Sequence, residues 1–156
     1  MLSAISNTRL GEVAPQLAEK IRQLAEMLEQ EGIVIQVVQS LRPWHVQEEL
    51  YAQGRTAPGE IVTNAQPGHS WHQFALAVDV APFADAKPDW NIKHPVWGRI
   101  VSIGTSLGLV SGAEWRTFPD APHLQLTGRF PVTPDDEVRY IFREAGLQGV
   151  WDEAFK

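Results

Sequence analysis

The stretch SWHQFALAVDV, residues 70–80, constrains the fold most, because its many apolar side chains are expected in the protein core. His72 and Asp79 lie seven residues apart within it. Burying an imidazole or a carboxylate is costly unless it has a polar partner. The stretch therefore has two interpretations: a bonded core histidine with an aspartate that closes a strand, or part of a functional site.

Length and charge limit the kinds of protein that this chain can be. Its 156 residues, 44% of them hydrophobic, fit a single domain over residues 1–156 with a core large enough to fold unaided. With 13 basic and 19 acidic residues the formal charge is -6, which argues against a nucleic-acid partner or an anionic membrane surface. We expect a monomer with neither of these partners.

The absence of cysteine limits the chemistry. The chain has no disulfide, thiol nucleophile or thiolate metal ligand, so any metal must be bound by histidine or carboxylate side chains. Residues 1–15 lack a basic segment followed by an apolar run, and no later segment is apolar for long enough to cross a membrane. We expect no signal peptide or membrane anchor in this chain.

Residue periodicity predicts four helices. In residues 12–32 the apolar side chains recur at spacings of four and three, and Gly32 ends the expected helix. The others are expected at residues 44–53, at 94–109 with Pro95 near the start, and from Thr133 to Gly146.

Three short strands are expected among these helices. They are a buried strand at residues 33–39, a strand at 77–83 that stops at Pro82, and a half-buried strand at 123–128. Residues 56–70 are rich in turn residues and predict a long loop. Helices and short strands in mixed order, separated by long loops, favour an α+β fold over a doubly wound parallel sheet.

His72 and Asp79 would need a third ligand to bind a catalytic zinc ion, which commonly has three protein ligands and one open position. Residues seven apart face opposite sides of a regular strand, so these two converge only if the chain turns at residues 73–76. His123 is the candidate third ligand. It opens the last expected strand.

Asp120 lies three residues before His123, in a turn that contains Pro122. Proline favours an extended Ala121, so Asp120 and His123 can face one cleft without both binding a metal. A hydrolytic metal site needs this division, because the metal acidifies a water while a nearby carboxylate transfers the proton. Glu114 is the alternative base.

The first of these segments resembles the Ser-x-His-x-x-Gly-x-Ala-x-Asp segment of zinc peptidases that cut peptidoglycan stem peptides. This family includes D-alanyl-D-alanine carboxypeptidases and dipeptidases and phage-type L-alanyl-D-glutamate endopeptidases. Ser70, His72, Ala77 and Asp79 match the segment. Ala75 stands where the family usually has glycine, and alanine tolerates a positive φ poorly.

Two further segments carry the resemblance, which covers about residues 10–130. Trp115, Asp120 and His123 match a segment with a tryptophan and an acid three residues before a histidine. Arg42 and Gln47 match an arginine in a turn with a glutamine five residues on, although proline follows Arg42 in place of the usual serine. The run LYAQGRT is similar to the endolysin branch.

The resemblance implies a fold and a site. The fold would be an α+β domain of the hedgehog/D,D-peptidase type, with a small, mainly antiparallel sheet flanked by helices. Zn²⁺ would be bound by His72, Asp79 and His123, and Asp120 would be the general acid/base. Arg42 would neutralise an oxyanion or a substrate carboxylate, and the other substrate contacts would be Gln47, Ser70 and Trp115.

The implied activity is amide hydrolysis in peptidoglycan stem peptides, as an L-alanyl-D-glutamate endopeptidase similar to endolysins. The alternatives are a D-alanyl-D-alanine carboxypeptidase or dipeptidase of the same family, and a non-catalytic zinc-bearing binding module. The protein would act on the cell wall as a released lysin or as an exported enzyme given without its leader. A Ser-His-Asp site at Ser70 is disfavoured, because no Gly-x-Ser-x-Gly turn surrounds it.

Overall fold

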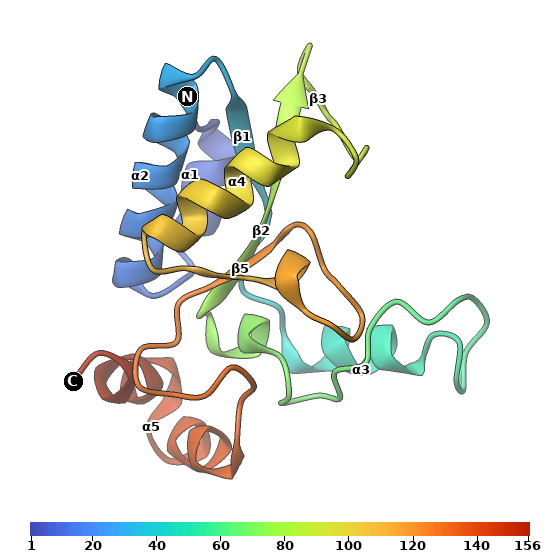
Figure 1. Cartoon of the computed structure of the whole chain (residues 1–156). Helices are drawn as coiled ribbons and strands as arrows, with labels where there is room; N and C mark the ends of the chain where they lie inside the picture. The colour runs from blue at the N-terminus through green and yellow to red at the C-terminus, as the bar shows by residue number, and fades with distance from the viewer. The chain divides into compact units, whose positions relative to one another are not determined.

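The computed structural model describes residues 1–156, and these group into two units (Figure 1). The first unit consists of Met1–Ser40 and Ala77–Leu126. The second consists of Leu41–Leu76 and Thr127–Lys156. The expected single domain over the whole chain stays a prediction.

The first unit contains one open antiparallel sheet in the order β1-β2-β5-β4, with the short β3 paired to β2. The α+β expectation with a small antiparallel sheet is therefore confirmed. The strands are β1 (Val34–Gln39), β2 (Ala77–Ala84), β3 (Lys87–Pro88), β4 (Val110–Ser111) and β5 (His123–Gln125).

Three helices belong to the first unit, namely α1 (Ala4–Leu10), α2 (Pro15–Gln30) and α4 (Pro95–Ser106). The helix predicted at residues 12–32 is α2, and Gly32 follows it with a φ of 76°. Its Leu17, Ile21, Leu24 and Leu28 are fully buried. Each such side chain contributes roughly 1.5–3 kcal/mol of hydrophobic stabilisation, so this stripe anchors α2 on β1 and α4.

The predicted end of the second strand at Pro82 is wrong, because β2 continues to Ala84. Val80 N donates to Pro122 O, so the backbone nitrogen of Val80 points away from β1. The backbone nitrogen of Pro82, two residues on, points to the same edge of the strand. β5 pairs with β2 only from Ala77 to Asp79, so no backbone N–H is needed at Pro82 for a hydrogen bond to β5. A strand can therefore pass through this proline, whose carbonyl accepts from Asp89 N at 2.8 Å.

The second unit contains α3 (Trp44–Ala52), the short 3₁₀ helix η1 (Trp71–Phe74) and α5 (Asp136–Ala154). Residues 58–70 form neither helix nor strand, in agreement with the predicted loop. Aromatic rings form the unit's core: Phe74 meets Trp44, Trp71 and Phe142 edge to face at 5.4–6.4 Å between ring centroids.

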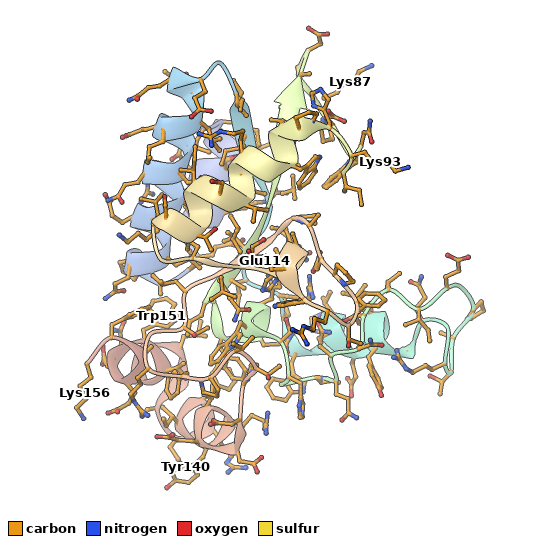
Figure 2. All side chains as sticks on the ribbon, viewed as in Figure 1. Lys87, Lys93, Glu114, Tyr140, Trp151 and Lys156 are labelled. Atoms are coloured by element: carbon orange, nitrogen blue, oxygen red, sulfur yellow. The ribbon has the colours of Figure 1, made fainter.

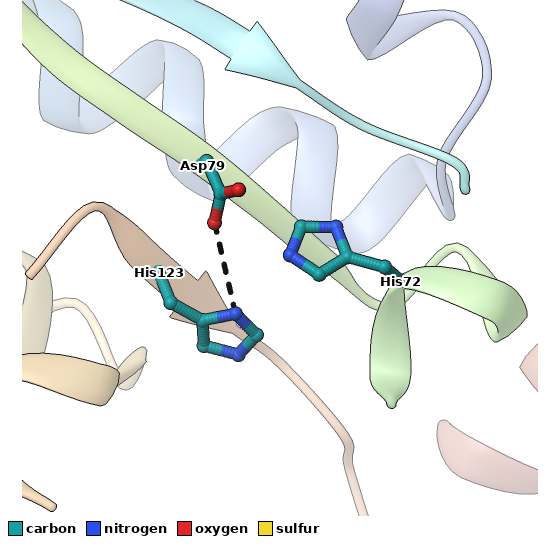
Figure 3. A group of neighbouring side chains, drawn as sticks. All are labelled: His72, Asp79 and His123. Atoms are coloured by element: carbon teal, nitrogen blue, oxygen red, sulfur yellow. Dashed lines mark ion pairs between the residues drawn. The ribbon is translucent and has the colours of Figure 1, made fainter. Parts of the chain in front are cut away.

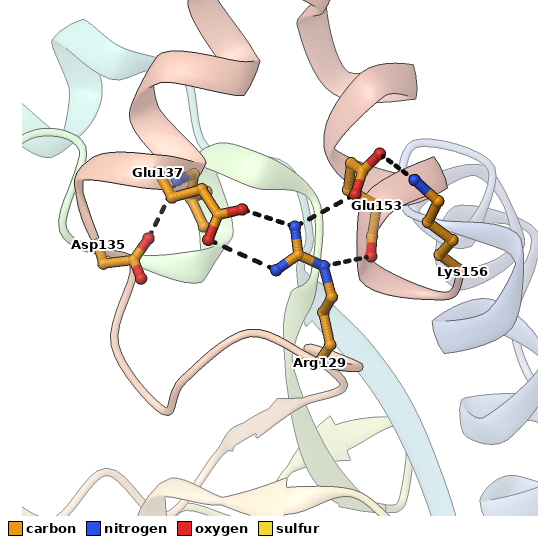
Figure 4. A network of polar contacts seen from close by, with 6 residues as sticks. Arg129, Asp135, Glu137, Glu153 and Lys156 are labelled. Carbon is orange, nitrogen blue, oxygen red and sulfur yellow. Dashed lines mark hydrogen bonds and ion pairs between the residues drawn. The ribbon is translucent and has the colours of Figure 1, made fainter.

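The predicted end of the last helix at Gly146 is only partly correct. Gly146 has non-helical backbone angles (φ 65°, ψ -164°), but a second helical segment follows it to Ala154. Arg129 bonds to Glu137 on the first segment and to Glu153 on the second, at 2.7 and 3.2 Å (Figure 4). The hydrogen bond to Glu137 raises the pKa of Arg129. No helix has both the length and the apolar character needed to span a membrane.

Candidate metal centre

Asp79 and His123 are brought together by strand register. Asp79 on β2 pairs directly with His123, the first residue of β5. The His123 Nδ1 atom lies 3.7 Å from Asp79 Oδ1 (Figure 3). The two side chains are only 4% and 15% exposed, so this is a nearly dry pair of potential ligands.

His72 lies on η1, and its backbone position is fixed by local hydrogen bonds. The Ser70 hydroxyl accepts from His72 N at 3.3 Å, and Ser70 N donates to Gln73 Oε1 at 3.4 Å. Ala75 then takes a left-handed conformation (φ 56°, ψ 33°), which ends η1 and leads into β2. The turn predicted between His72 and Asp79 is thus confirmed, with alanine in the conformation that favours glycine.

His72, Asp79 and His123 form a group whose potential ligand atoms all lie within 4.8 Å of one another (Figure 3). They offer two imidazole nitrogens and one carboxylate oxygen. This is the donor set of many three-ligand catalytic zinc sites, so the group could hold a metal ion.

Gln125 is a member of this site that the sequence analysis missed. Its Oε1 atom lies 2.8 Å from His123 Nε2. Because an amide oxygen only accepts, this contact requires the proton on Nε2, and a neutral ring with that proton has its Nδ1 lone pair on the Asp79 side. Residues two apart in a strand share a face, which is the signal that could have identified Gln125.

The expectation of a half-buried strand at β5 is wrong, because all three of its residues are buried. β5 lies between β2 and β4 in the sheet and has no exposed edge. Its alternation separates the apolar Leu124 from the polar pair His123 and Gln125, and both faces are covered.

Gly112 is a second residue that the sequence analysis missed, on the short 3₁₀ helix η2 (Gly112–Glu114). Its carbonyl accepts from Asp120 N at 2.9 Å, and Asp120 O accepts from His123 N at 3.2 Å. A Cβ atom at Gly112 would lie 2.6 Å from Asp120 O and 2.9 Å from His123 Cβ. Close backbone packing therefore holds the predicted acid/base beside the predicted ligand.

Trp115 lies against His123 as well. Its ring centroid is 4.9 Å from that of His123, and its buried Nε1 has no hydrogen-bond partner. A buried donor of this kind is expected to serve a ligand or a water. Asp120 is half-buried, whereas Glu114, labelled in Figure 2, is exposed.

Arg42 and Gln47, in the second unit, contact each other. Arg42 Nη1 donates to Gln47 Oε1 at 2.7 Å, and Arg42 N donates to His72 O at 3.0 Å. Gln47 is fully buried and is also bonded to Ala65 O and the Gln73 side chain. The arginine is thus held at its backbone and at its guanidinium, while the substrate roles of Arg42, Gln47, Ser70 and Trp115 stay predictions.

Several known proteins are similar to this chain. A relative, the peptidoglycan L-alanyl-D-glutamate endopeptidase CwlK of Bacillus subtilis (strain 168), is 37% identical over 106 residues. The match covers 61% of this chain and 62% of that protein, so it spans less than two thirds of the relative's length.

Solved structures share the fold. The L-Ala D-Glu endopeptidase ChiX of Serratia marcescens aligns with a TM-score of 0.60 at 23% identity, covering 94% of each chain. A vancomycin-resistance D,D-pentapeptidase VanY in complex with Zn(II) aligns with a TM-score of 0.56 at 14% identity, covering 88% of this chain and 83% of that chain. These likenesses confirm the expected D,D-peptidase type of α+β fold.

Two family models match, and both are described as D-alanyl-D-alanine carboxypeptidase. The second, Peptidase_M15_4, matches residues 63–126, which include His72, Asp79, Asp120 and His123. The first, VanY, matches residues 11–94, more than half of the chain. The resemblance carried by the three sequence segments is confirmed, and the chain belongs to the VanY family of D-alanyl-D-alanine carboxypeptidases.

Proposed function

We propose that this protein is a zinc metallopeptidase that hydrolyses the L-alanyl-D-glutamate bond of peptidoglycan stem peptides. The observation that carries the proposal is a two-histidine, one-carboxylate group with a further carboxylate, Asp120, held beside it. CwlK and ChiX are both named as L-alanyl-D-glutamate endopeptidases, which supports the choice of this bond. Zinc fits the site, because its preferred nitrogen and oxygen donors are present in the usual number.

In this proposal His72, Asp79 and His123 hold the metal. When bound there, zinc supplies Lewis acidity that makes a water acidic at neutral pH and polarises the scissile carbonyl. Gln125 keeps the His123 ring in one tautomer. Asp120 takes a proton from the attacking water and gives it to the leaving amine, a transfer that needs a carboxylate held off the metal.

Two further side chains have roles around the scissile bond in this proposal. Arg42 places a permanent positive charge near the developing oxyanion or a substrate carboxylate, and its bond to Gln47 limits its rotation. Trp115 offers its buried Nε1 donor to a substrate carbonyl. Both roles orient the stem peptide and do not transfer protons.

The second candidate is removal of the terminal D-alanine, which is favoured by the description of the matching family models. Purified peptidoglycan digested with the protein, followed by mass analysis, separates the two. New amino-terminal D-glutamate supports the endopeptidase, and released D-alanine supports the carboxypeptidase. We propose that either activity acts on the cell wall, after release or export of the protein.

The zinc content of the isolated protein tests the metal site. About one zinc per chain is expected, and His72→Ala, Asp79→Ala and His123→Ala should each lose most of it, because two protein ligands compete poorly with water and chelators. His45→Ala is the matched control, since His45 is an exposed histidine of α3. Undiminished zinc in all three variants would exclude this ligand set.

A further inference from the structure

The first unit has a pocket that the proposed mechanism does not use in full. Its volume is about 730 Å³, and one wall is the face of α4 that carries Trp97, Val101 and Thr105. The opposite wall comes from Glu114 and from Pro119 to Pro122, and so includes Asp120. The pocket therefore begins at the proposed acid/base and extends along α4.

An exposed aromatic surface lies beside this pocket. Trp90 is 53% exposed, and its ring stacks on that of the buried Trp97 at 6.2 Å between centroids and 29° between planes. Ile92, which lines the pocket, is 65% exposed. Large apolar side chains gathered on a surface in this way mark a site of interaction.

The segment that presents Trp90 is held in place by its own hydrogen bonds. Asp89 accepts from Asn91 N at 3.0 Å and contacts His94 Nδ1 at 3.3 Å. Trp97 Nε1 donates to Asp89 O at 3.2 Å, which ties the segment to the start of α4. Trp90 is thus presented before any ligand binds, so little ordering entropy is lost on binding.

The charge of the pocket selects one side of the substrate. Its lining has two carboxylates, Glu114 and Asp120, and no lysine or arginine. In a stem peptide the amine side of the L-alanyl-D-glutamate bond begins with a residue that carries a free carboxylate, which these acids repel. The acyl side is uncharged, because L-alanine is joined through an amide to the lactyl group of N-acetylmuramic acid.

We propose that this pocket, with Trp90 at its edge, binds the N-acetylmuramic acid ring on the acyl side of the scissile bond. The inference rests on the proposed endopeptidase function. One residue, about 3.8 Å between Cα atoms, separates the lactyl group from the bond that is cut, so the sugar must lie close to Asp120. The weakly positive C–H groups of a sugar ring pack well on the negative face of an indole, and the exposed Ser102 hydroxyl on α4 can meet its polar substituents.

The test compares two soluble substrates that share the scissile bond: a free stem tetrapeptide and the same tetrapeptide on N-acetylmuramic acid. Trp90→Ala should lower kcat/KM on the muramyl substrate by about tenfold and leave the free peptide nearly unchanged. Gly98→Phe should have the same selective effect by filling the pocket, since nothing lies within 4 Å of a Cβ atom at Gly98. Tyr140→Ala, which removes a 58% exposed aromatic ring of α5, is the matched control (Figure 2).

Equal losses on both substrates, or no loss in either variant, would overturn the sugar site while leaving the endopeptidase function intact. Parent enzyme that releases D-alanine from both substrates and leaves the L-alanyl-D-glutamate bond uncut would overturn the proposed function, and this inference with it. Circular dichroism of each variant separates a local effect from misfolding. A misfolded Trp90→Ala leaves Gly98→Phe as the deciding variant.

Discussion

Two segments supply the candidate site, and they reach it by opposite uses of a small residue. In the segment of residues 70–80, Ala75 takes a left-handed conformation that glycine usually occupies. In the segment of residues 112–125, Gly112 has an ordinary φ but leaves no room for a methyl group. The turn at Ala75 depends on a strained dihedral angle, and the turn at Gly112 depends on the absence of a side chain.

This difference predicts that substitutions in the two segments have unequal costs. The strain at Ala75 is a fixed cost of about 1–2 kcal/mol, which the surrounding core holds in place. The packing at Gly112 involves the backbone of Asp120, which cannot rotate away as a flexible side chain can. The segment of residues 112–125 should therefore be the more sensitive one, in chemistry as well as in stability.

The largest effect is expected at Asp120, the proposed acid/base in that segment. Asp120→Asn should keep zinc and the fold and lower turnover by roughly 10²–10⁴-fold, because a positioned proton-transfer group is removed while the metal ligands remain. Turnover and zinc content are measured on the same preparation. Glu114→Gln is the matched control, and a larger loss there than at Asp120 would identify Glu114 as the base.

A smaller but still large effect is expected for Gly112→Ala. The added Cβ would lie 2.6 Å from Asp120 O, so the backbone must move and carry Asp120 with it. A misplacement of about 1 Å is enough to lower turnover by roughly 10²-fold. Gly98→Ala, compared on the free stem tetrapeptide that lacks the sugar, is the control, since its Cβ meets nothing within 4 Å and alanine favours the helix. Equal activity in the two variants would remove the spatial argument for Gly112.

The next effect in size concerns zinc affinity. Gln125→Ala removes the acceptor that lies 2.8 Å from His123 Nε2, so a buried N–H loses its partner and the ring is free to turn. Loss of such a partner typically weakens metal binding by about 10–100-fold, measured by competition with a chelator. Gln148→Ala, an exposed glutamine of α5, should bind zinc as the parent does. Parental affinity in Gln125→Ala would mean that the other contacts of His123, such as its packing against Trp115, are enough to orient the ring.

The same two segments differ in how much the sequence could predict. His72, Asp79 and the turn between them lie within eight residues, so periodicity and one known segment were sufficient. Helix α2 could be predicted equally well, because its buried apolar residues recur at helical spacing along the chain. These features depend on local spacing.

Gly112 was missed because its role depends on a distance that no local pattern encodes, whereas Gln125 had a local signal, its position two residues from His123 on one strand face. Gly112 matters through its approach to a residue eight positions away, and glycine in a turn usually indicates a dihedral preference instead. The strand end predicted at Pro82 was wrong for a related reason. Whether a proline ends a strand depends on which edge it faces, and only the register of β5 on β2 decides that.

The smallest effect is expected for Ala75→Gly, the reverse of the change at Gly112. Glycine relieves the left-handed strain of about 1–2 kcal/mol, but it adds about 0.4–1 kcal/mol of unfolded-state entropy and removes a buried methyl worth roughly 0.8 kcal/mol. These terms nearly cancel, so thermal stability, zinc content and turnover should all stay close to the parent. Ala75→Val should instead destabilise the protein, because a β-branched residue is a strong outlier at a φ of 56°. Melting temperatures of the two variants decide the matter: a large loss in Ala75→Gly would show that the buried methyl of Ala75, and not its dihedral angle, sets the turn between His72 and Asp79.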